Sequence, residues 1–123
     1  MAPEITPVGI EEQIREVAQR MARGVGICSE RYLTYLEASR AYDLAYAHAY
    51  LGGHDEGEQP PAHERRYRAE IATTEQRGKR DVADAAYRHA DRTARALEHE
   101  LRALQSVGAS LRAQYGVAGV GER

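Results

Sequence analysis

The sequence ADAAYRHADRTARALEHELRALQSVGASLRAQY, at residues 83–115, decides the fold class. Apolar or small residues recur in it at alternating spacings of four and three. This heptad period is typical of an α-helix that packs along one face, and no proline interrupts it. The stripe consists of Ala83, Tyr87, Ala90, Ala94, Leu97, Leu101, Leu104, Gly108, Leu111 and Tyr115.

The same helix is expected to begin well before residue 83, because no proline occurs between Ala62 and the end of the stripe. The upstream apolar or small residues keep the heptad spacing but are out of phase with the later stripe, as a stutter would make them. We therefore predict one helix over residues 62–115. The out-of-phase residues are Tyr67, Ile71, Thr74 and Gly78.

A second proline-free stretch, residues 10–51, has its own heptad stripe and predicts the first helix. Its one interruption is Gly24-Val25-Gly26, where two glycines at about 1 kcal/mol each relative to alanine favour a kink or a division. The sequence leaves open whether this segment is a hinge. The stripe consists of Ile14, Ala18, Met21, Val25, Cys28, Tyr32, Tyr35, Ser39, Tyr42, Tyr46 and Ala49.

Glycine and proline delimit the two helices. Residues 52–61, GGHDEGEQPP, are acidic and end on two prolines, which predicts a turn that makes the helices antiparallel neighbours. Residues 1–9 are expected to be a disordered lead-in, and residues 116–123 a flexible, glycine-rich tail. The predicted fold is all-α: a long, coiled-coil-like antiparallel hairpin of two helices, the first kinked if the glycines bend it.

A hairpin of two helices has a thin interior. The chain has no Phe or Trp but eight Tyr, and the tyrosines of the first helix are expected to face alanines of the second. The outer apolar residues Leu33, Leu36, Leu44, Tyr50, Val82 and Val107 need further cover, which predicts a homodimer or higher oligomer. The residues predicted for the helix seam and oligomer core are Met21, Tyr32, Tyr35, Tyr42, Tyr46, Tyr87, Leu97, Leu101, Leu104 and Leu111.

Composition excludes several protein classes. The formal net charge of −2 argues against a strongly basic nucleic-acid coat, and a single cysteine, Cys28, forms no internal disulfide. The sequence shows neither a secretory signal nor a membrane span. We expect a soluble protein of the cytoplasm, or of the host cytoplasm if a phage encodes it.

Catalytic and metal-binding motifs are absent from the sequence. No histidine has an acidic residue three positions before it, and His-Glu-x-x-His, Gly-x-Ser-x-Gly and Walker motifs do not occur. Cys28 lies in the heptad stripe, where a free cysteine usually acts as a small hydrophobe. His54, Asp55, Glu56, Glu58 and His63 crowd the turn, which we interpret as a solvated loop. We expect no enzyme, cofactor or metal site.

Basic residues gather at the start of the predicted second helix. Arginines beside a tyrosine are suited to contact phosphate and to stack on a base. Glu64, Glu70, Glu75 and Asp81 are interleaved with them, so a helix surface of salt bridges is favoured over a DNA-binding surface. The residues that would contact nucleic acid are Arg65, Arg66, Arg68, Arg77, Lys79 and Arg80.

Two segments, YDLAYAHAYL at residues 42–51 and LQSVGASLR at residues 104–112, carry a resemblance to known proteins. The chain resembles a loose group of small Ala- and Arg-rich helical-hairpin proteins from the early regions of actinobacterial temperate phages. The resemblance implies a phage-encoded accessory to DNA recombination or replication. It implies no catalytic or ligand-binding residue.

Together these features predict a non-enzymatic helical interaction and oligomerisation module that binds itself and a protein partner. One alternative is a DNA-binding protein that acts without sequence preference through the basic residues. A further alternative is a virion assembly scaffold or chaperone, for which a long helical hairpin is equally suitable.

Overall fold

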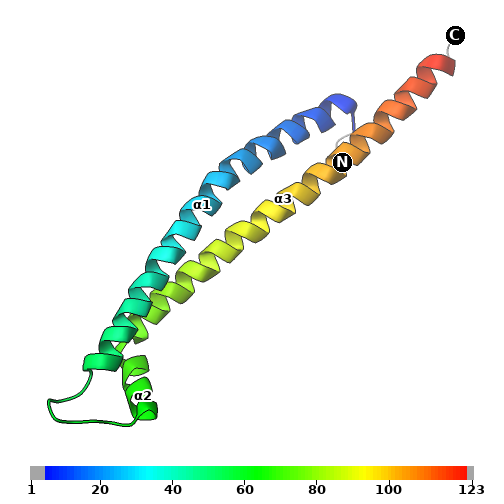
Figure 1. Ribbon diagram of the computed structural model, residues 1–123. Helices are drawn as coiled ribbons and strands as arrows, with labels where there is room; N and C mark the ends of the chain where they lie inside the picture. The colour runs from blue at the N-terminus through cyan, green and yellow to red at the C-terminus, as the bar shows by residue number, and fades with distance from the viewer. Residues whose placement is uncertain (1–4, 122–123) are drawn as a thin grey trace. The chain divides into compact units, whose positions relative to one another are not determined.

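The computed structural model describes residues 5–121, and side chains as far as residue 116. Within residues 5–121 the chain forms three helices and no strand, and α1 packs against α3 in a hairpin-like manner (Figure 1). The helices are α1 (Pro7–Gly52), α2 (Ala62–Ala72) and α3 (Thr74–Gly121). The prediction of an all-α fold with hairpin-like packing is therefore confirmed.

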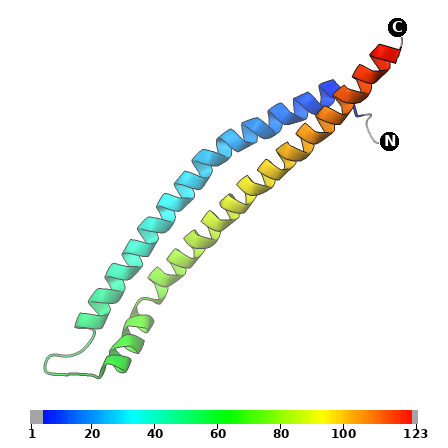
Figure 2. The same ribbon diagram turned by 45° about the vertical axis from the view of Figure 1, so that its right-hand side comes forward.

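The chain divides into two compact units. Unit 1 combines the residues up to Ile27 with those from Asp91 onward, and unit 2 is Cys28–Ala90. Each unit contains one segment of α1 and one segment of α3, which run side by side in both views (Figure 1 and Figure 2). The boundary in α1 lies after Ile27, one residue beyond the Gly24-Val25-Gly26 segment, and the helix continues through this segment without a break.

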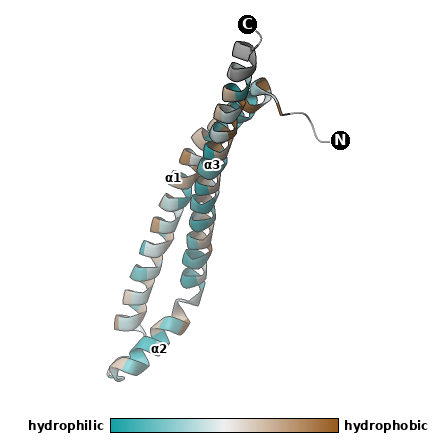
Figure 3. Ribbon diagram, turned by 90° about the vertical axis from the view of Figure 1, so that its right-hand side faces the viewer, coloured by the Kyte–Doolittle hydropathy of each residue, from teal (hydrophilic) through white to brown (hydrophobic). Residues whose placement is uncertain are grey.

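Unit 1 is held by an apolar seam between antiparallel helix segments. Early α1 meets late α3, since a methyl group on Gly108 would lie 3.3 Å from Cγ2 of Ile10. Later α1 meets earlier α3, since Arg20 Nη1 lies 3.9 Å from Glu100 Oε2. Figure 3 shows that the hydrophobic residues of α3 concentrate in this unit. The most deeply buried apolar side chains here are Ile10, Val17 and Leu97.

From Ala94 to Leu111 the α3 stripe predicted from the sequence is the inner face of the helix in unit 1, but its last residue, Tyr115, is 59% exposed, so the prediction was wrong there. Leu97 and Gly108 are buried, while Leu101, Leu104 and Leu111 are half-buried. On α1 the predicted stripe was wrong at two positions. Ala18 and Val25 are exposed, and in each case the preceding residue, Val17 or Gly24, occupies the inner position. The heptad spacing begins at Ile10, and this phase places the larger Val17 in the seam. The inner α1 residues are Ile10, Ile14, Val17, Met21 and Gly24.

Unit 2 has a more polar seam, also between antiparallel segments. The Tyr32 and Tyr87 rings lie 5.2 Å apart, and further along α1 the Tyr42 ring lies 4.5 Å from the Arg80 guanidinium carbon. Figure 3 shows the hydrophilic character of α3 in this unit. The inner positions of α2 and α3 are Ala69, Thr73, Gln76, Arg80, Ala83 and Tyr87.

These inner positions continue the spacing of four and three without a phase change, so the predicted stutter is absent. Tyr67, Ile71, Thr74 and Gly78, which suggested it, are all exposed. The prediction followed apolar residues, whereas three of the inner positions in unit 2 are the polar Thr73, Gln76 and Arg80. Polar residues in the seam therefore concealed a continuous heptad.

The predicted second helix is divided at Thr73. Thr73 has φ −112° and ψ 18°, outside helical values, and its hydroxyl donates to the carbonyl of Ala69 at 2.7 Å. The Thr74 hydroxyl donates to the carbonyls of Glu70 and Ile71. Threonine hydroxyls that bond the preceding turn bend helices, and two consecutive threonines account for the break between α2 and α3.

Helix α1 begins within the expected lead-in. The Gly9 amide donates to Thr6 Oγ1 at 3.0 Å, and Pro7 occupies the first helical position. Threonine before proline is a favourable start, because the hydroxyl satisfies a free amide and proline has none to satisfy. Residues 1–4 of the predicted lead-in lie outside the described chain. At the other end α3 continues to Gly121, into the predicted flexible tail, of which residues 122 and 123 are outside the description.

The predicted turn, residues 52–61, is a connection with defined glycine positions. Gly57 has φ +84°, and the Glu58 amide donates to the Asp55 carbonyl at 3.0 Å, as expected for a type II turn with glycine third. A side chain on Gly53 would collide with the Ala49 carbonyl that its amide contacts. Two of the glycines are therefore required by the backbone.

Alanine at Gly24 and Gly26 is expected to stabilise the protein. Both glycines lie inside α1, and an added methyl group would have no neighbour within 4 Å. Each substitution removes the entropic cost of a helical glycine, worth about 0.5–1 kcal/mol. Thermal unfolding followed by circular dichroism should show a higher midpoint for each variant. Gly57→Ala is the control and should lower it, because its positive φ disfavours alanine.

Candidate functional site

The basic residues predicted to contact nucleic acid are mostly engaged within the protein. Arg65 Nε donates to the Pro60 carbonyl at 2.9 Å, and Lys79 Nζ lies 3.3 Å from Glu75 Oε1. Arg80 pairs with Asp81 at 3.1 Å while its guanidinium covers the Tyr42 ring. These contacts assign structural roles to residues that were candidates for binding phosphate.

Arg68 joins α2 to the turn that precedes it. Its guanidinium lies 2.7 Å from Glu58 Oε1 and 2.8 Å from Glu64 Oε1. The side-chain hydrogen bond from Arg68, followed by one from the Asp55 amide, lowers the pKa of Glu58 from its ordinary value. Hydrogen bonds with Glu64 and Glu58 raise the pKa of Arg68. Both partners therefore stay charged, and Arg68 holds the turn rather than a ligand.

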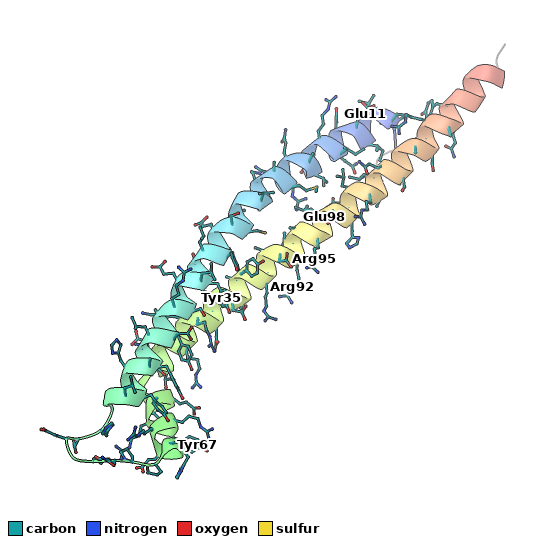
Figure 4. All side chains as sticks on the ribbon, viewed as in Figure 1. Glu11, Tyr35, Tyr67, Arg92, Arg95 and Glu98 are labelled. Carbon is teal, nitrogen blue, oxygen red and sulfur yellow. The ribbon has the colours of Figure 1, made fainter. Side chains whose placement is uncertain are left out.

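Arg66 and Arg77 are the predicted contacts whose side chains have neither an ion pair nor a hydrogen bond in the described part of the chain. The Arg66 guanidinium carbon lies 5.1 Å from the centre of the Tyr67 ring, and Tyr67 is 53% exposed. Figure 4 shows Tyr67 projecting outward from α2. Arg77 is half-buried near the start of α3. Two cations and one ring are a small surface for a nucleic acid.

The predicted tyrosine stripe of α1 forms a ladder in unit 2. The ring centres of Tyr42 and Tyr46 are 6.1 Å apart, and those of Tyr46 and Tyr50 are 6.3 Å apart. Tyr35, Tyr42 and Tyr46 are half-buried as expected, whereas Tyr32 is 44% exposed. The Tyr32 ring meets the Tyr87 ring and the Tyr42 ring meets the Arg80 guanidinium, whereas the sequence had predicted alanines opposite the tyrosines of the first helix.

The polar seam contains a buried atom without a hydrogen bond. Gln76 Oε1 is buried and has no partner among the described residues. The sequence analysis did not predict Gln76 or Thr73 as inner positions, and it identified Arg80 only as a candidate nucleic-acid contact. Continuing the heptad spacing backward from Ala83 would have found all three. Such polar seam residues weaken the pairing but can fix its register.

Most of the outer apolar residues predicted to need cover are exposed. Leu33, Leu44, Val82 and Val107 are exposed, whereas Leu36 and Tyr50 are half-buried. The prediction missed Leu51, which is 71% exposed, and Ile71, which is 77% exposed. Leu33, Leu44 and Leu51 lie on one side of α1 in unit 2. We call these three residues the leucine strip.

Other candidate sites have less support. Among residues 5–121 no three His, Cys, Asp or Glu side chains are grouped to hold a metal ion, and Cys28 is half-buried. A hollow of about 290 Å³ lies at the start of α1, with Thr6, Gly9 and Glu12 among its lining residues. Glu16 and Gln13 complete its polar lining. Of the surfaces on the described chain, the leucine strip is the best-defined candidate for binding.

Within the described residues no helix has the length and apolar character needed to cross a lipid bilayer. Comparison of the chain with protein-family models, with curated proteins and with solved structures found no match. The resemblance to phage hairpin proteins therefore rests on residues 42–51 and 104–112 alone, and it stays a prediction.

Proposed function

We propose that the chain is a non-enzymatic helical module that self-associates and presents its outer helix surface to a protein partner. The observation behind this proposal is the leucine strip, whose side chains are 64%, 62% and 71% exposed. Three large apolar side chains on one side of a helix are costly to leave in water, at about 25 cal/mol per Å² of apolar surface. Association would remove this surface from solvent.

The thin interior of each unit supports the same proposal. In unit 1 one helix segment covers only one side of the other, and few large side chains are buried. In unit 2 the buried residues lack large side chains; they are Pro60, Ala69, Thr73 and Ala83. A chain with little interior is a natural candidate for completion by a second copy.

We expect sedimentation velocity or light scattering at micromolar concentration to show a dimer or a higher oligomer. The apparent mass should fall on dilution, since association through a short apolar strip is concentration-dependent. A monodisperse monomer of 13.7 kDa at these concentrations would contradict the proposal. The circular dichroism of the same samples should confirm that the helices are formed.

The resemblance implies an accessory role in phage DNA recombination or replication, and this role indicates where to search for the partner. If that role is right, the protein should copurify with recombination or replication proteins from infected cells. A role in virion assembly would instead place it with procapsids. Neither role is required for self-association, so this experiment tests the context of the module separately.

Direct DNA binding is less well supported, because Arg65, Arg68, Lys79 and Arg80 already have partners within the protein. We expect no mobility shift of single- or double-stranded DNA at about 50 mM salt, where phosphate contacts are strong. A shift that weakens steeply with salt would reverse this conclusion. Its loss in the double variant Arg66→Ala/Arg77→Ala, with Arg92→Ala as an exposed control (Figure 4), would then locate the site.

A further inference from the structure

The leucine strip has the geometry of a helix-pairing seam. Leu33, Leu44 and Leu51 are separated by intervals of 11 and 7 residues, so at 100° per residue they lie within about 20° of one another around α1. The strip is about 27 Å long at 1.5 Å per residue. Heptad spacing adds Glu37, Arg40 and Ala47, all exposed, to the same side of the helix. This set is separate from the inner positions of α1 in unit 2.

The charged side chains along the leucine strip form no ion pairs within α1, whereas several charged side chains of α3 form ion pairs within their own helix. On α3, Glu75 pairs with Lys79, Asp84 with Arg88 and Asp91 with Arg95, all at a spacing of four. Glu37, Arg40 and Asp43 follow one another at a spacing of three, which also permits intrahelical pairs. None of them has an ion pair in the described part of the chain. They are exposed and available to a partner.

We propose that the leucine strip pairs with the leucine strip of a second copy, in antiparallel orientation about a two-fold axis near Tyr42. This inference rests on the proposed self-association and specifies its surface. The arrangement places Leu33 of one copy at the level of Leu51 of the other. Leu44 then lies at the level of Arg40 from the second copy, against the aliphatic part of that side chain.

The antiparallel orientation follows from the charges. With the axis near Tyr42, position 40 of one copy is level with position 44 of the other. Arg40 therefore lies one residue from the level of Asp43 of the second copy, and both side chains are on the same side of the contact. Glu37 lies near Ala47 and His48 of the second copy, on the other side of the contact, where no acidic side chain opposes it. A parallel pair would put Arg40 beside Arg40 and Glu37 beside Glu37, which is repulsive. Opposite charges at the rim of a small apolar contact select orientation.

The opposite surface of unit 2 offers no comparable seam. Ile71 and Val82 are exposed there, at 77% and 72%. The charges around them already form the intrahelical pairs Glu75–Lys79 and Asp84–Arg88. An exposed apolar residue among paired charges is ordinary surface. Ile71 is therefore a suitable site for a control substitution.

Cysteine cross-linking tests the orientation. In a Cys28→Ser background, chains with Leu33→Cys and Leu51→Cys carry tags of different size and are mixed at micromolar concentration before oxidation. We expect the mixed Leu33→Cys with Leu51→Cys product to dominate. Dominant products between two Leu33→Cys chains and between two Leu51→Cys chains would show a parallel pair and overturn the proposal. Ala22→Cys, on an exposed part of α1 outside the strip, is the control for random collision.

Charge exchange tests the pairing of Arg40 with Asp43. Arg40→Asp and Asp43→Arg are each expected to raise the dimer dissociation constant about 10-fold, since each change affects two symmetric contacts. The double variant exchanges the charges and should restore the original constant to within about 3-fold. Arg31→Asp, an exposed change away from the strip, should have little effect. Absence of rescue would overturn the assigned contact.

Leu44→Glu separates this inference from the proposed function. We expect it to raise the dissociation constant at least 100-fold with helicity unchanged, whereas Ile71→Glu should leave it unaltered. If the unmodified protein is a dimer and Leu44→Glu remains one, self-association stands but another surface mediates it, and the inference is wrong. If the unmodified protein is a monomer, the proposed function itself is wrong.

Discussion

Replacing Leu97 with aspartate is expected to separate the helix segments of unit 1. Leu97 is 5% exposed and lies in the apolar seam, so the substitution removes a large buried side chain and introduces a charge without a partner. The combined cost is about 3–5 kcal/mol, comparable to the whole stability of a small domain. Far-ultraviolet circular dichroism should show a large loss of helix at 25 °C.

The matched control for this substitution is Ala96→Asp, one residue earlier on the same helix. Ala96 is exposed, so the change costs only the difference in helix propensity, about 0.6 kcal/mol. The comparison separates burial from the effect of an aspartate in α3. If both variants lose helix to the same extent, the buried position of Leu97 in the seam is not the cause of the unfolding.

Gly108→Leu is expected to force the helices of unit 1 apart. Gly108 is buried, and even a methyl group there would lie 3.3 Å from Ile10 Cγ2 and 3.7 Å from Arg112 Nη1. A leucine needs more room than this contact leaves, and overpacking typically costs about 1–3 kcal/mol. The midpoint of thermal or urea denaturation should fall accordingly.

Gly78→Leu is the control on the same helix, and it is expected to raise the stability rather than lower it. Gly78 is exposed, and an added methyl group would have no neighbour within 4 Å. Leucine at this position should stabilise α3 by up to about 1 kcal/mol, because it replaces a helical glycine on an open surface. A loss of stability in both glycine variants would mean that close approach at Ile10 is not what distinguishes Gly108.

The regular part of the fold could be predicted from sequence because its signal is apolar. The stripe from Ala83 to Leu111 is the inner face of α3, as its spacing indicated. The apolar pattern did not predict the seam where polar side chains occupy it, at Thr73, Gln76 and Arg80. It pointed instead to Tyr67 and Ile71, which are exposed.

The helix boundaries were missed for a different reason. The break at Thr73 depends on hydroxyl groups that bond carbonyls of the preceding turn, an effect of two particular side chains rather than of periodicity. The start of α1 depends on Thr6 before Pro7, a capping signal that was present in the sequence but was read as part of a disordered lead-in. Short-range hydrogen bonding sets these boundaries, and hydropathy does not report it.

The candidate surface was partly predictable in the same way. Leu33 and Leu44 were identified as outer residues in need of cover, whereas Leu51 was missed because it adjoins the turn. The interleaved charges correctly predicted salt bridges of the basic residues with Glu64, Glu75 and Asp81, whereas the pair of Arg68 with Glu58 in the turn was not predicted. Ion pairs between a loop and a helix depend on how the loop folds, which residue spacing does not reveal.

The tyrosine ladder has a spectroscopic consequence. Every tyrosine except Tyr115 belongs to unit 2, and the chain has no tryptophan to mask their emission. Tyrosine fluorescence and the near-ultraviolet dichroism of the closely spaced rings therefore report almost entirely on residues 28–90. Far-ultraviolet dichroism reports on the helices of both units, so the protein carries an intrinsic optical probe that can distinguish local melting of unit 2 from loss of the whole fold.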